Sequence, residues 1–200
     1  MELILVRHAQ AEMDADHPEA DPPLSDRGRR QAAALAARAA SWKRPSLVVV
    51  SPARRAAQTA EPLCAALGVG PAVAEWLDEL ACSDGAITDA TERVRVNRGL
   101  EELLSSLGCA RVGTETPARH WEIAREDARL VLVGHGMAHA VALEHLLGIE
   151  GVPWAGLRFQ LVHAAFTRVR AFRAPASPAW VFGLLAHNEI DHVARELRSY

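Results

Sequence analysis

The stretch Leu3-Ile4-Leu5-Val6-Arg7-His8 puts a short apolar run directly before two polar residues that can take part in chemistry. Such a run is typical of a strand that is buried on both faces and delivers polar side chains at its carboxyl end. Leu47–Val50 before Ser51, and Arg129–Val133 before Gly134-His135, repeat the pattern. The three runs therefore predict strands of one sheet whose polar residues gather at one edge.

Helix signals lie between the predicted strands. Ser25 can cap a helix that runs to about Ala40, and Ser51 with Pro52 can start a second helix that ends at Gly68. The remaining expected elements are helices over Thr91–Leu107 and Met137–Leu147, a loop-rich segment between them, and strands over Phe159–Phe172 and Trp180–Ala186. The alternation predicts an α/β fold, a three-layer α/β/α sandwich with a mainly parallel central sheet.

Length and composition limit the possible classes of protein. The 200 residues, half of them apolar, are enough for a single domain over residues 1–200. Because the net charge is −3 and the charges are interspersed, we expect neither a nucleic-acid partner nor a membrane surface. The sequence opens without the basic stretch of a signal peptide, and no run is long enough to span a membrane. Widely spaced cysteines without a CxxC pair predict neither disulfides nor thiolate zinc, so we expect a cytoplasmic protein.

The candidate site consists of Arg7, His8, Arg55 and His135. A neutral imidazole is a competent nucleophile toward phosphorus. Guanidinium groups bind phosphate oxygens through paired, charge-assisted hydrogen bonds. Gly136 allows the backbone to approach an anion closely, and a helix that begins there offers free N–H groups. Together these residues indicate phosphoryl transfer, a reaction that depends on positioning and charge stabilisation.

Four motifs in a fixed order carry a family resemblance. They are Arg7-His8-Ala9, Leu24-Ser25-Asp26-Arg27-Gly28-Arg29-Arg30-Gln31-Ala32, Ser51-Pro52-Ala53-Arg54-Arg55-Ala56-Ala57-Gln58-Thr59-Ala60 and Val133-Gly134-His135-Gly136. They resemble the histidine phosphatase superfamily, which includes the cofactor-dependent phosphoglycerate mutases. The segment from Asn188 to Val193 is similar to the C-terminal pattern of that family.

The resemblance implies a metal-independent phosphatase that hydrolyses a phosphate monoester through a phosphohistidine on His8. It also implies that Arg7, Arg55 and His135 hold the phosphoryl group, and that no metal or organic cofactor takes part. The partner would be a small phosphorylated substrate. The sequence leaves the identity of that substrate and the oligomeric state open.

The proton donor is expected from the segment Leu77-Asp78-Glu79-Leu80, which matches a triplet that carries the acid in the family. The match points to Glu79, and Asp78 and Glu75 remain alternatives. Two departures weaken any closer assignment. Residues 81–85 lack the frequent Gly-x-Trp-Glu-Gly continuation, and Asp14 stands where phosphoglycerate mutases usually keep Asn, which argues against mutase activity.

The sequence is also compatible with other functions. The rival functions are a protein phosphohistidine phosphatase, a phosphomutase and a pseudoenzyme that only binds a phosphorylated ligand. His135 and His139 are four residues apart, a spacing that also occurs in metal sites. His17, His120, His145 and His163 lie in no motif, so we expect solvated or hydrogen-bonded roles, while His187 is a weaker candidate for the pocket. Substrate specificity is expected from residues 9–23, 81–127 and 150–158.

Overall fold

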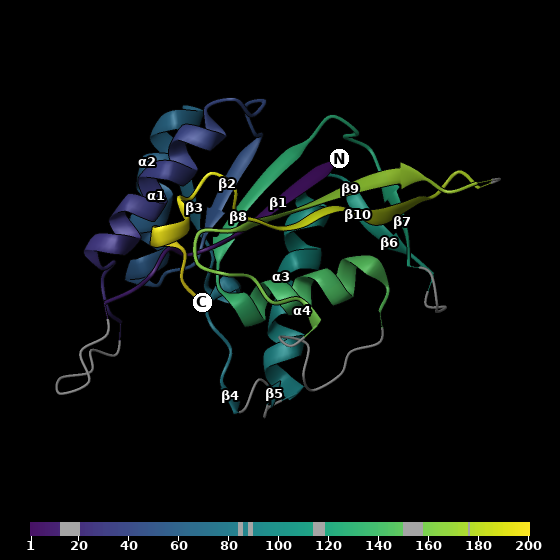
Figure 1. The fold of residues 1–200 in the computed structure, drawn as a ribbon. Coiled ribbons are helices and arrows are strands. Elements are labelled where there is room, and N and C mark those ends of the chain that lie inside the picture. Colours follow the sequence, from purple (N-terminus) through teal and green to yellow (C-terminus); the bar gives the residue numbers. More distant parts are fainter. Residues whose placement is uncertain (13–20, 84–85, 88–89, 114–118, 150–157, 176) are drawn as a thin grey trace.

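The computed structural model describes residues 1–12, 21–83, 86–87, 90–113, 119–149, 158–175 and 177–200. An eight-stranded sheet runs through these residues in the order β3-β2-β8-β1-β9-β10-β7-β6. Helices cover both of its faces (Figure 1). Within the described part of the chain, no helix is both long and apolar enough to cross a membrane.

The parallel half of the sheet contains the three apolar runs recognised in the sequence. It consists of β3 (Pro71–Val73), β2 (Leu47–Val50), β8 (Arg129–Gly134) and β1 (Glu2–Arg7). Val133 of β8 pairs in register with Val6 on one side and with Val50 on the other. Because the strands are parallel and in register, their carboxyl ends form one edge.

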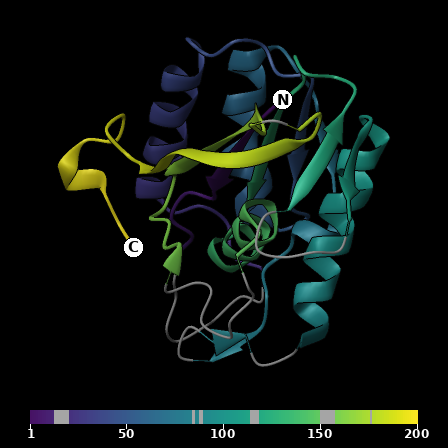
Figure 2. The same cartoon turned by 90° about the vertical axis from the view of Figure 1, so that its right-hand side faces the viewer.

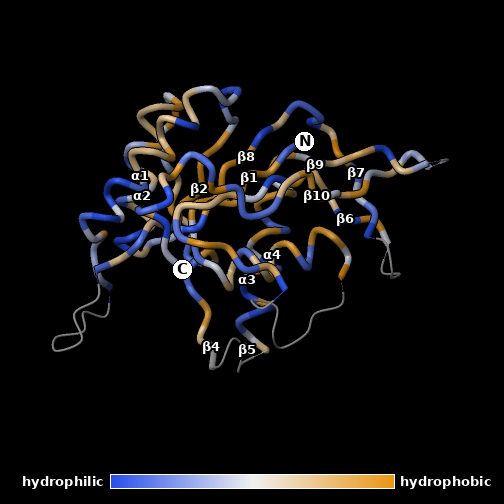
Figure 3. Tube along the Cα trace, viewed as in Figure 1, coloured by the Kyte–Doolittle hydropathy of each residue, from blue (hydrophilic) through white to orange (hydrophobic). Residues whose placement is uncertain are grey.

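Alternate side chains of β1 enter different cores, as the two-residue period of a strand requires. Leu3 and Leu5 pack with side chains of α3 (Ala90–Ser106) and α4 (Gly136–Leu147). Ile4 and Val6 pack with side chains of α1 (Asp26–Ala39) and α2 (Arg54–Leu67). Figure 2 shows the helices on either side of the sheet, and Figure 3 shows its apolar central strands. The predicted α/β/α sandwich is therefore confirmed.

The other half of the sheet is antiparallel. β9 (Phe166–Arg173) pairs with β1, and β10 (Trp180–Glu189), β7 (His120–Ile123) and β6 (Cys109–Val112) follow outward. A separate hairpin pairs β4 (Cys82–Ser83) with β5 (Ala86–Ile87). The loop-rich assignment was wrong for β6 and β7. The strand expected from Phe159 begins only at Phe166, because residues 161–165 form the turn that bonds to the end of β1.

Helix boundaries agree with the sequence signals except at the start of α2. Ser25 caps α1 by accepting a hydrogen bond from the Gly28 amide at 3.0 Å, as predicted. The residues that follow α2 and α4, Gly68 and Gly148, have φ angles of 63° and 68°, a conformation that glycine adopts readily. However, α2 begins at Arg54 rather than Pro52, and the Asp21 carboxylate, rather than Ser51, accepts from the Arg54 amide, at 2.9 and 3.0 Å. The Ser51 hydroxyl accepts from the Ala53 amide just before the helix, and it also reaches across the sheet edge to His135.

Candidate active site

The candidate residues meet where the parallel strands end. His8 follows β1, Ser51 follows β2, and His135 follows β8. The His8 amide donates to the carbonyl of Gly134 at 2.8 Å, which holds the ends of β1 and β8 together. Arg55 reaches the same point from the first turn of α2. The structure thus brings Arg7, His8, Arg55 and His135 to one edge of the sheet.

His8 is held in one tautomer by its own backbone surroundings. Its Nδ1 lies 2.7 Å from the carbonyl oxygen of Ala9. A carbonyl can only accept, so Nδ1 carries the proton and Nε2 keeps a lone pair. The side chain is buried, and burial, reinforced by Arg7 and Arg55, lowers the pKa of His8 to about 3. The ring is therefore a neutral base at ordinary pH.

Arg55 connects the two histidines. Its Nε lies 3.3 Å from Nε2 of His8, and its Nη2 lies 3.2 Å from Nδ1 of His135. Because a guanidinium can only donate, Nδ1 of His135 accepts and the proton of that ring is on Nε2. Nε2–H is then 2.8 Å from the Ser51 hydroxyl and 3.3 Å from Asp78 Oδ1. His135 is fully buried, and burial is the main cause that lowers its pKa.

Two of the three guanidinium nitrogens of Arg7 have partners, and the third has none among the described residues. Its Nη1 donates to the Leu161 carbonyl, and its Nη2 lies 3.2 Å from Nε2 of His163. Its Nε is buried without a hydrogen-bond partner among the described residues. A Cβ added to Gly136 would lie 3.8 Å from this Nε, so the guanidinium lies close to the first turn of α4. The Arg7 Nε–H and the start of that helix can therefore serve one anion.

His163 belongs to the site, although the sequence placed it in no motif. Its ring centroid is 5.5 Å from that of His8, and burial and Arg7 lower its pKa to about 4. Its Nδ1 lies 3.1 Å from the Ser199 hydroxyl, which also accepts from Gln31 Nε2 at 2.9 Å. Gln31 Oε1 in turn accepts from the Gln10 amide at 2.8 Å. Gln31, the glutamine of the second motif, thus holds His163 in place through Ser199.

Glu79 is the carboxyl group that faces the pocket. Its Oε2 lies 3.7 Å from Nδ1 of His135, and its Oε1 accepts from the Leu80 amide at 3.1 Å. Burial raises the pKa of Glu79, although the Leu80 amide and the nearby Arg7 and Arg55 oppose the rise. A raised carboxyl pKa suits a general acid, because the group keeps its proton closer to neutral pH.

The two alternative carboxyl groups are placed less suitably. Asp78 Oδ1 accepts from the Ser51 hydroxyl at 3.2 Å and from the Glu79 amide at 2.9 Å. Through these bonds Asp78 holds the segment in place. Glu75 is exposed at the start of a short 3₁₀ turn, and its backbone carbonyl accepts from Arg95 and from the Asp78 amide.

A cavity of about 370 Å³ opens beside Arg7 and Glu79. Its wall is mostly apolar and consists of Arg7, Glu79, Gly136, Met137, Phe159, Gln160, Leu161, Val162 and Tyr200. Arg7 is the only cation in this described lining. Much of the sequence from which specificity was expected, including Asp14 and residues 150–157, lies outside the described residues.

The other histidines do not form a metal site in the part of the chain that is described. His139 is buried and lies 2.8 Å from the Val6 carbonyl through Nε2, so it braces β1. His145 contacts Arg119 and Glu101, and His187 lies 2.9 Å from the Thr167 hydroxyl. Among the described residues, no group of three or more His, Cys, Asp or Glu side chains is arranged to hold a metal ion. His17 lies outside them.

Comparisons with solved structures show that the fold recurs in known proteins. Among solved structures, "Mycobacterial hydrolase 1" is 25% identical with a TM-score of 0.68, covering 94% of this chain and 99% of that one. A mycobacterial glucosyl-3-phosphoglycerate phosphatase is 22% identical with a TM-score of 0.66, covering 94% and 98%. A phosphoserine phosphatase from Entamoeba histolytica, the H9A mutant with phosphoserine, is 17% identical with a TM-score of 0.67, covering 96% and 99%.

No curated protein sequence matches the chain. The family model of the histidine phosphatase superfamily (branch 1) matches residues 3–174. That range contains Arg7, His8, Arg55, Glu79 and His135. The chain belongs to the histidine phosphatase superfamily.

Proposed function

We propose that the chain is a phosphohydrolase that cleaves a phosphate monoester through a phosphohistidine on Nε2 of His8. The placement of this nitrogen is the observation that carries the proposal. The bond from Nδ1 to the Ala9 carbonyl, 2.7 Å long, leaves the lone pair on Nε2, and Arg55 lies 3.3 Å from it. A neutral nucleophile beside a guanidinium suits attack on a phosphate that the guanidinium holds.

Two displacements complete the reaction. In the first, Nε2 of His8 forms a bond to phosphorus while the bond from phosphorus to the alkoxide oxygen breaks, and Glu79 gives its proton to that oxygen. In the second, the Glu79 carboxylate takes a proton from water as the water oxygen attacks phosphorus. The bond from nitrogen to phosphorus then breaks, and inorganic phosphate leaves with His8 neutral again.

Charge stabilisation comes from the surrounding side chains. Arg7 and Arg55 bind the non-bridging oxygens, and the free N–H groups of α4 add a positive helix end. His135 completes the pocket, since it contacts both Arg55 and Glu79. Arginines supply the positive charge that a metal ion supplies in other phosphatases, so the proposed reaction needs no metal. We also propose that the protein acts in the cytoplasm.

The described lining of the cavity favours hydrolysis over transfer to a second phosphorylated molecule. Met137, Phe159 and Val162 offer apolar contact, and Arg7, the cation in this lining, is already assigned to the transferred group. A mutase would need further cations for a second phosphate. We therefore propose a small monoester whose alcohol part is largely uncharged.

Phosphate release from a panel of phosphorylated metabolites, sugars and phosphopeptides tests the proposal. We expect turnover that survives exhaustive chelation and that vanadate, a mimic of five-coordinate phosphorus, inhibits competitively. A His8→Ala variant is the control and should lose turnover. Strict dependence on added zinc or magnesium would overturn the metal-independent reaction. Release from phosphohistidine peptides alone would instead favour a protein phosphohistidine phosphatase, and tight ligand binding without turnover would favour a pseudoenzyme.

A further inference from the structure

A strongly basic cavity of about 300 Å³ lies at the opposite edge of the sheet, where β1 and β8 begin. Its charged lining contains one carboxylate, Glu2, and five cations: Arg38, Lys43, Arg129, Arg168 and Arg170. Ser41, Trp42 and Ile4 complete the lining. The whole chain carries a net charge of −3, so this concentration of positive charge runs against its average.

Glu2 fixes the positions of two arginine side chains that line this basic cavity, Arg129 and Arg168. Its buried carboxylate accepts from Nε and Nη2 of Arg129 at 3.0 and 2.6 Å, and from Nε and Nη2 of Arg168 at the same two distances. Burial opposes ionisation, but the hydrogen bonds and charges of the two arginines lower the pKa of Glu2 overall. The carboxylate is therefore ionised and fixes two guanidinium groups in place.

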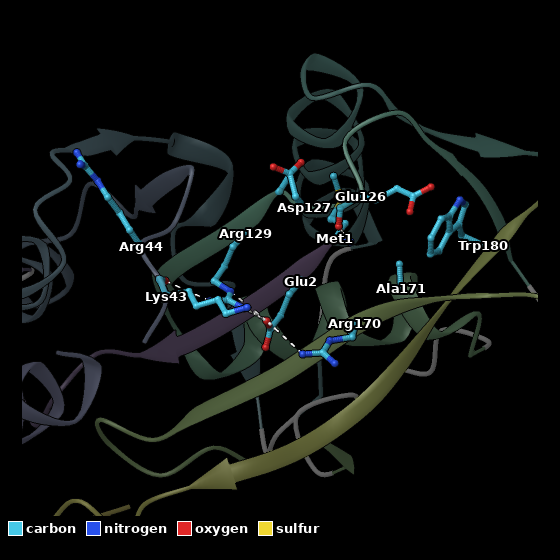
Figure 4. A pocket seen from close by; sticks show the side chains of 11 residues that line it. Met1, Glu2, Lys43, Arg44, Glu126, Asp127, Arg129, Arg170, Ala171 and Trp180 are labelled. Atoms are coloured by element: carbon cyan, nitrogen blue, oxygen red, sulfur yellow. Dashed lines mark hydrogen bonds and ion pairs between the residues drawn. The ribbon is translucent and has the colours of Figure 1, made fainter. Parts of the chain in front are cut away.

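The remaining cations exceed what Glu2 can neutralise. Arg170 Nη2 is 3.7 Å from Glu2, an ion pair that Figure 4 marks with a dashed line. The Arg170 side chain is 45% exposed. Lys43 lines both this cavity and the neighbouring one, which is drawn in Figure 4. Arg38 donates to the Ser41 hydroxyl at 2.9 Å. Like charges gathered in a partly enclosed space repel one another, and a bound anion would relieve that repulsion.

We propose that the basic cavity binds a small anion with clustered phosphate groups, of the pyrophosphate or nucleoside di- and triphosphate class. Several cations beyond the single carboxylate suit more than one phosphate, and fixed guanidinium groups suit their oxygens. The neighbouring cavity of about 420 Å³ adds the carboxylates of Glu126 and Asp127, which disfavour an anion that extends further that way. The site is distinct from the catalytic pocket, since Glu2 begins β1 and His8 follows its end.

The test variant removes three positive charges from the basic cavity and keeps the ion pairs of Glu2 with Arg129 and Arg168. Arg38→Gln, Lys43→Gln and Arg170→Gln together leave the bidentate pairs of Glu2 with Arg129 and Arg168 in place. The matched control, Arg27→Gln, Arg30→Gln and Arg98→Gln, makes the same change in net charge at exposed positions of α1 and α3. Both proteins should unfold at temperatures close to that of the wild type and keep its turnover.

Titration calorimetry with inorganic pyrophosphate and with ATP measures the affinity, and amide NMR shifts locate the bound anion. We expect shifts at residues 41–43 and 168–170, and affinity weakened roughly tenfold or more in the test variant but not in the control. Raised salt should weaken binding by the wild type. Equal affinity in all three proteins, shifts confined to the catalytic pocket, or binding of long polyanions alone would overturn the proposal.

Discussion

Arg7 and His163 form a pair in which the guanidinium Nη2 lies 3.2 Å from the imidazole Nε2. The ring is neutral and accepts from Arg7, while its Nδ1 is anchored on Ser199. This contact fixes Nη2 of the Arg7 guanidinium, while its Nε has no partner among the described residues. His163 is therefore a positioning residue for the arginine.

Replacement of His163 by Ala should lower kcat/KM roughly 10- to 100-fold, because a small displacement of a binding group is costly in a preorganised site. Steady-state kinetics on an active monoester checks this. His163→Gln should recover part of the loss, since its amide oxygen can accept from Arg7, and His120→Ala should behave as wild type. Equal impairment of the Ala and Gln variants would show that His163 only fills space.

Labelled substrate should leave its phosphoryl group on His8. Because Nε2 holds the lone pair, rapid quenching without acid, followed by peptide mapping, should find the label on that residue. With a nitrophenyl ester, whose leaving group needs no proton, Glu79→Gln should increase the trapped fraction, because the attack of water on phosphorus uses the carboxylate. Label on His135, or near-normal turnover by His8→Ala, would refute the assignment of the nucleophile.

Glu79→Gln should act according to the leaving group. An alkyl alkoxide needs a proton as it departs and a nitrophenolate does not, so single-turnover phosphorylation by an alkyl ester should slow by roughly 100-fold or more. The nitrophenyl ester should be much less affected. Asp78→Asn is the comparison, and it should lower stability instead. Equal losses on both esters would indicate a structural role for Glu79.

Folding stability should fall as the pH drops below neutrality. Folded His8 has a pKa of about 3, and folded His139 and His163 have pKa values of about 4, against an ordinary 6.5. At a pH between the folded and the ordinary pKa of such a histidine, the unfolded chain binds a proton that the folded chain does not. Each of these histidines therefore lowers the free energy of unfolding by up to about 1.4 kcal/mol for every pH unit of acidification. Urea unfolding between pH 7 and pH 4.5 measures the slope. His163→Gln should make it shallower, and an unchanged slope would contradict the buried neutral state.

Gly28→Ala should destabilise the protein, although alanine usually stabilises a helix. A Cβ at Gly28 would lie 2.0 Å from the Gln10 carbonyl oxygen, which is backbone and cannot move aside freely. We expect a loss of about 2 kcal/mol in the free energy of unfolding, the scale of an overpacked core. Arg27→Ala, at the exposed neighbouring position, should change it by roughly 0.5 kcal/mol or less. A more stable Gly28→Ala protein would show that the contact is relieved cheaply.

The parallel core was predictable because its signals are local. Leu47–Val50 forms a strand with the boundaries expected, and the left-handed conformations at Gly68 and Gly148 end their helices where glycine indicated. β6 and β7 escaped prediction because they are outer strands with few buried residues, and long-range pairing defines them. Local sequence contains little information about such pairings.

Part of the site was also beyond local patterns. Arg7, His8, Arg55 and His135 stood in motifs, but His163 acquires its role from a turn that packs against the end of β1. Ser51 was expected to cap a helix, which its position beside Pro52 suggested. Its hydroxyl does accept from the Ala53 amide before the helix, but it also meets His135, a residue 84 positions away. The sequence gives no local sign of this second contact.

The order in which the chain is synthesised adds a consequence of β1 lying between β8 and β9. On the ribosome, His8 emerges long before His135, and the segment with His163 and Ser199 follows later still. Until those later segments are made, β1 lacks the two strands that hydrogen-bond to its edges. The proposed phosphate pocket is consequently complete only after the segment with His163 and Ser199 has been synthesised, so a nascent chain that ends before this segment should not release phosphate.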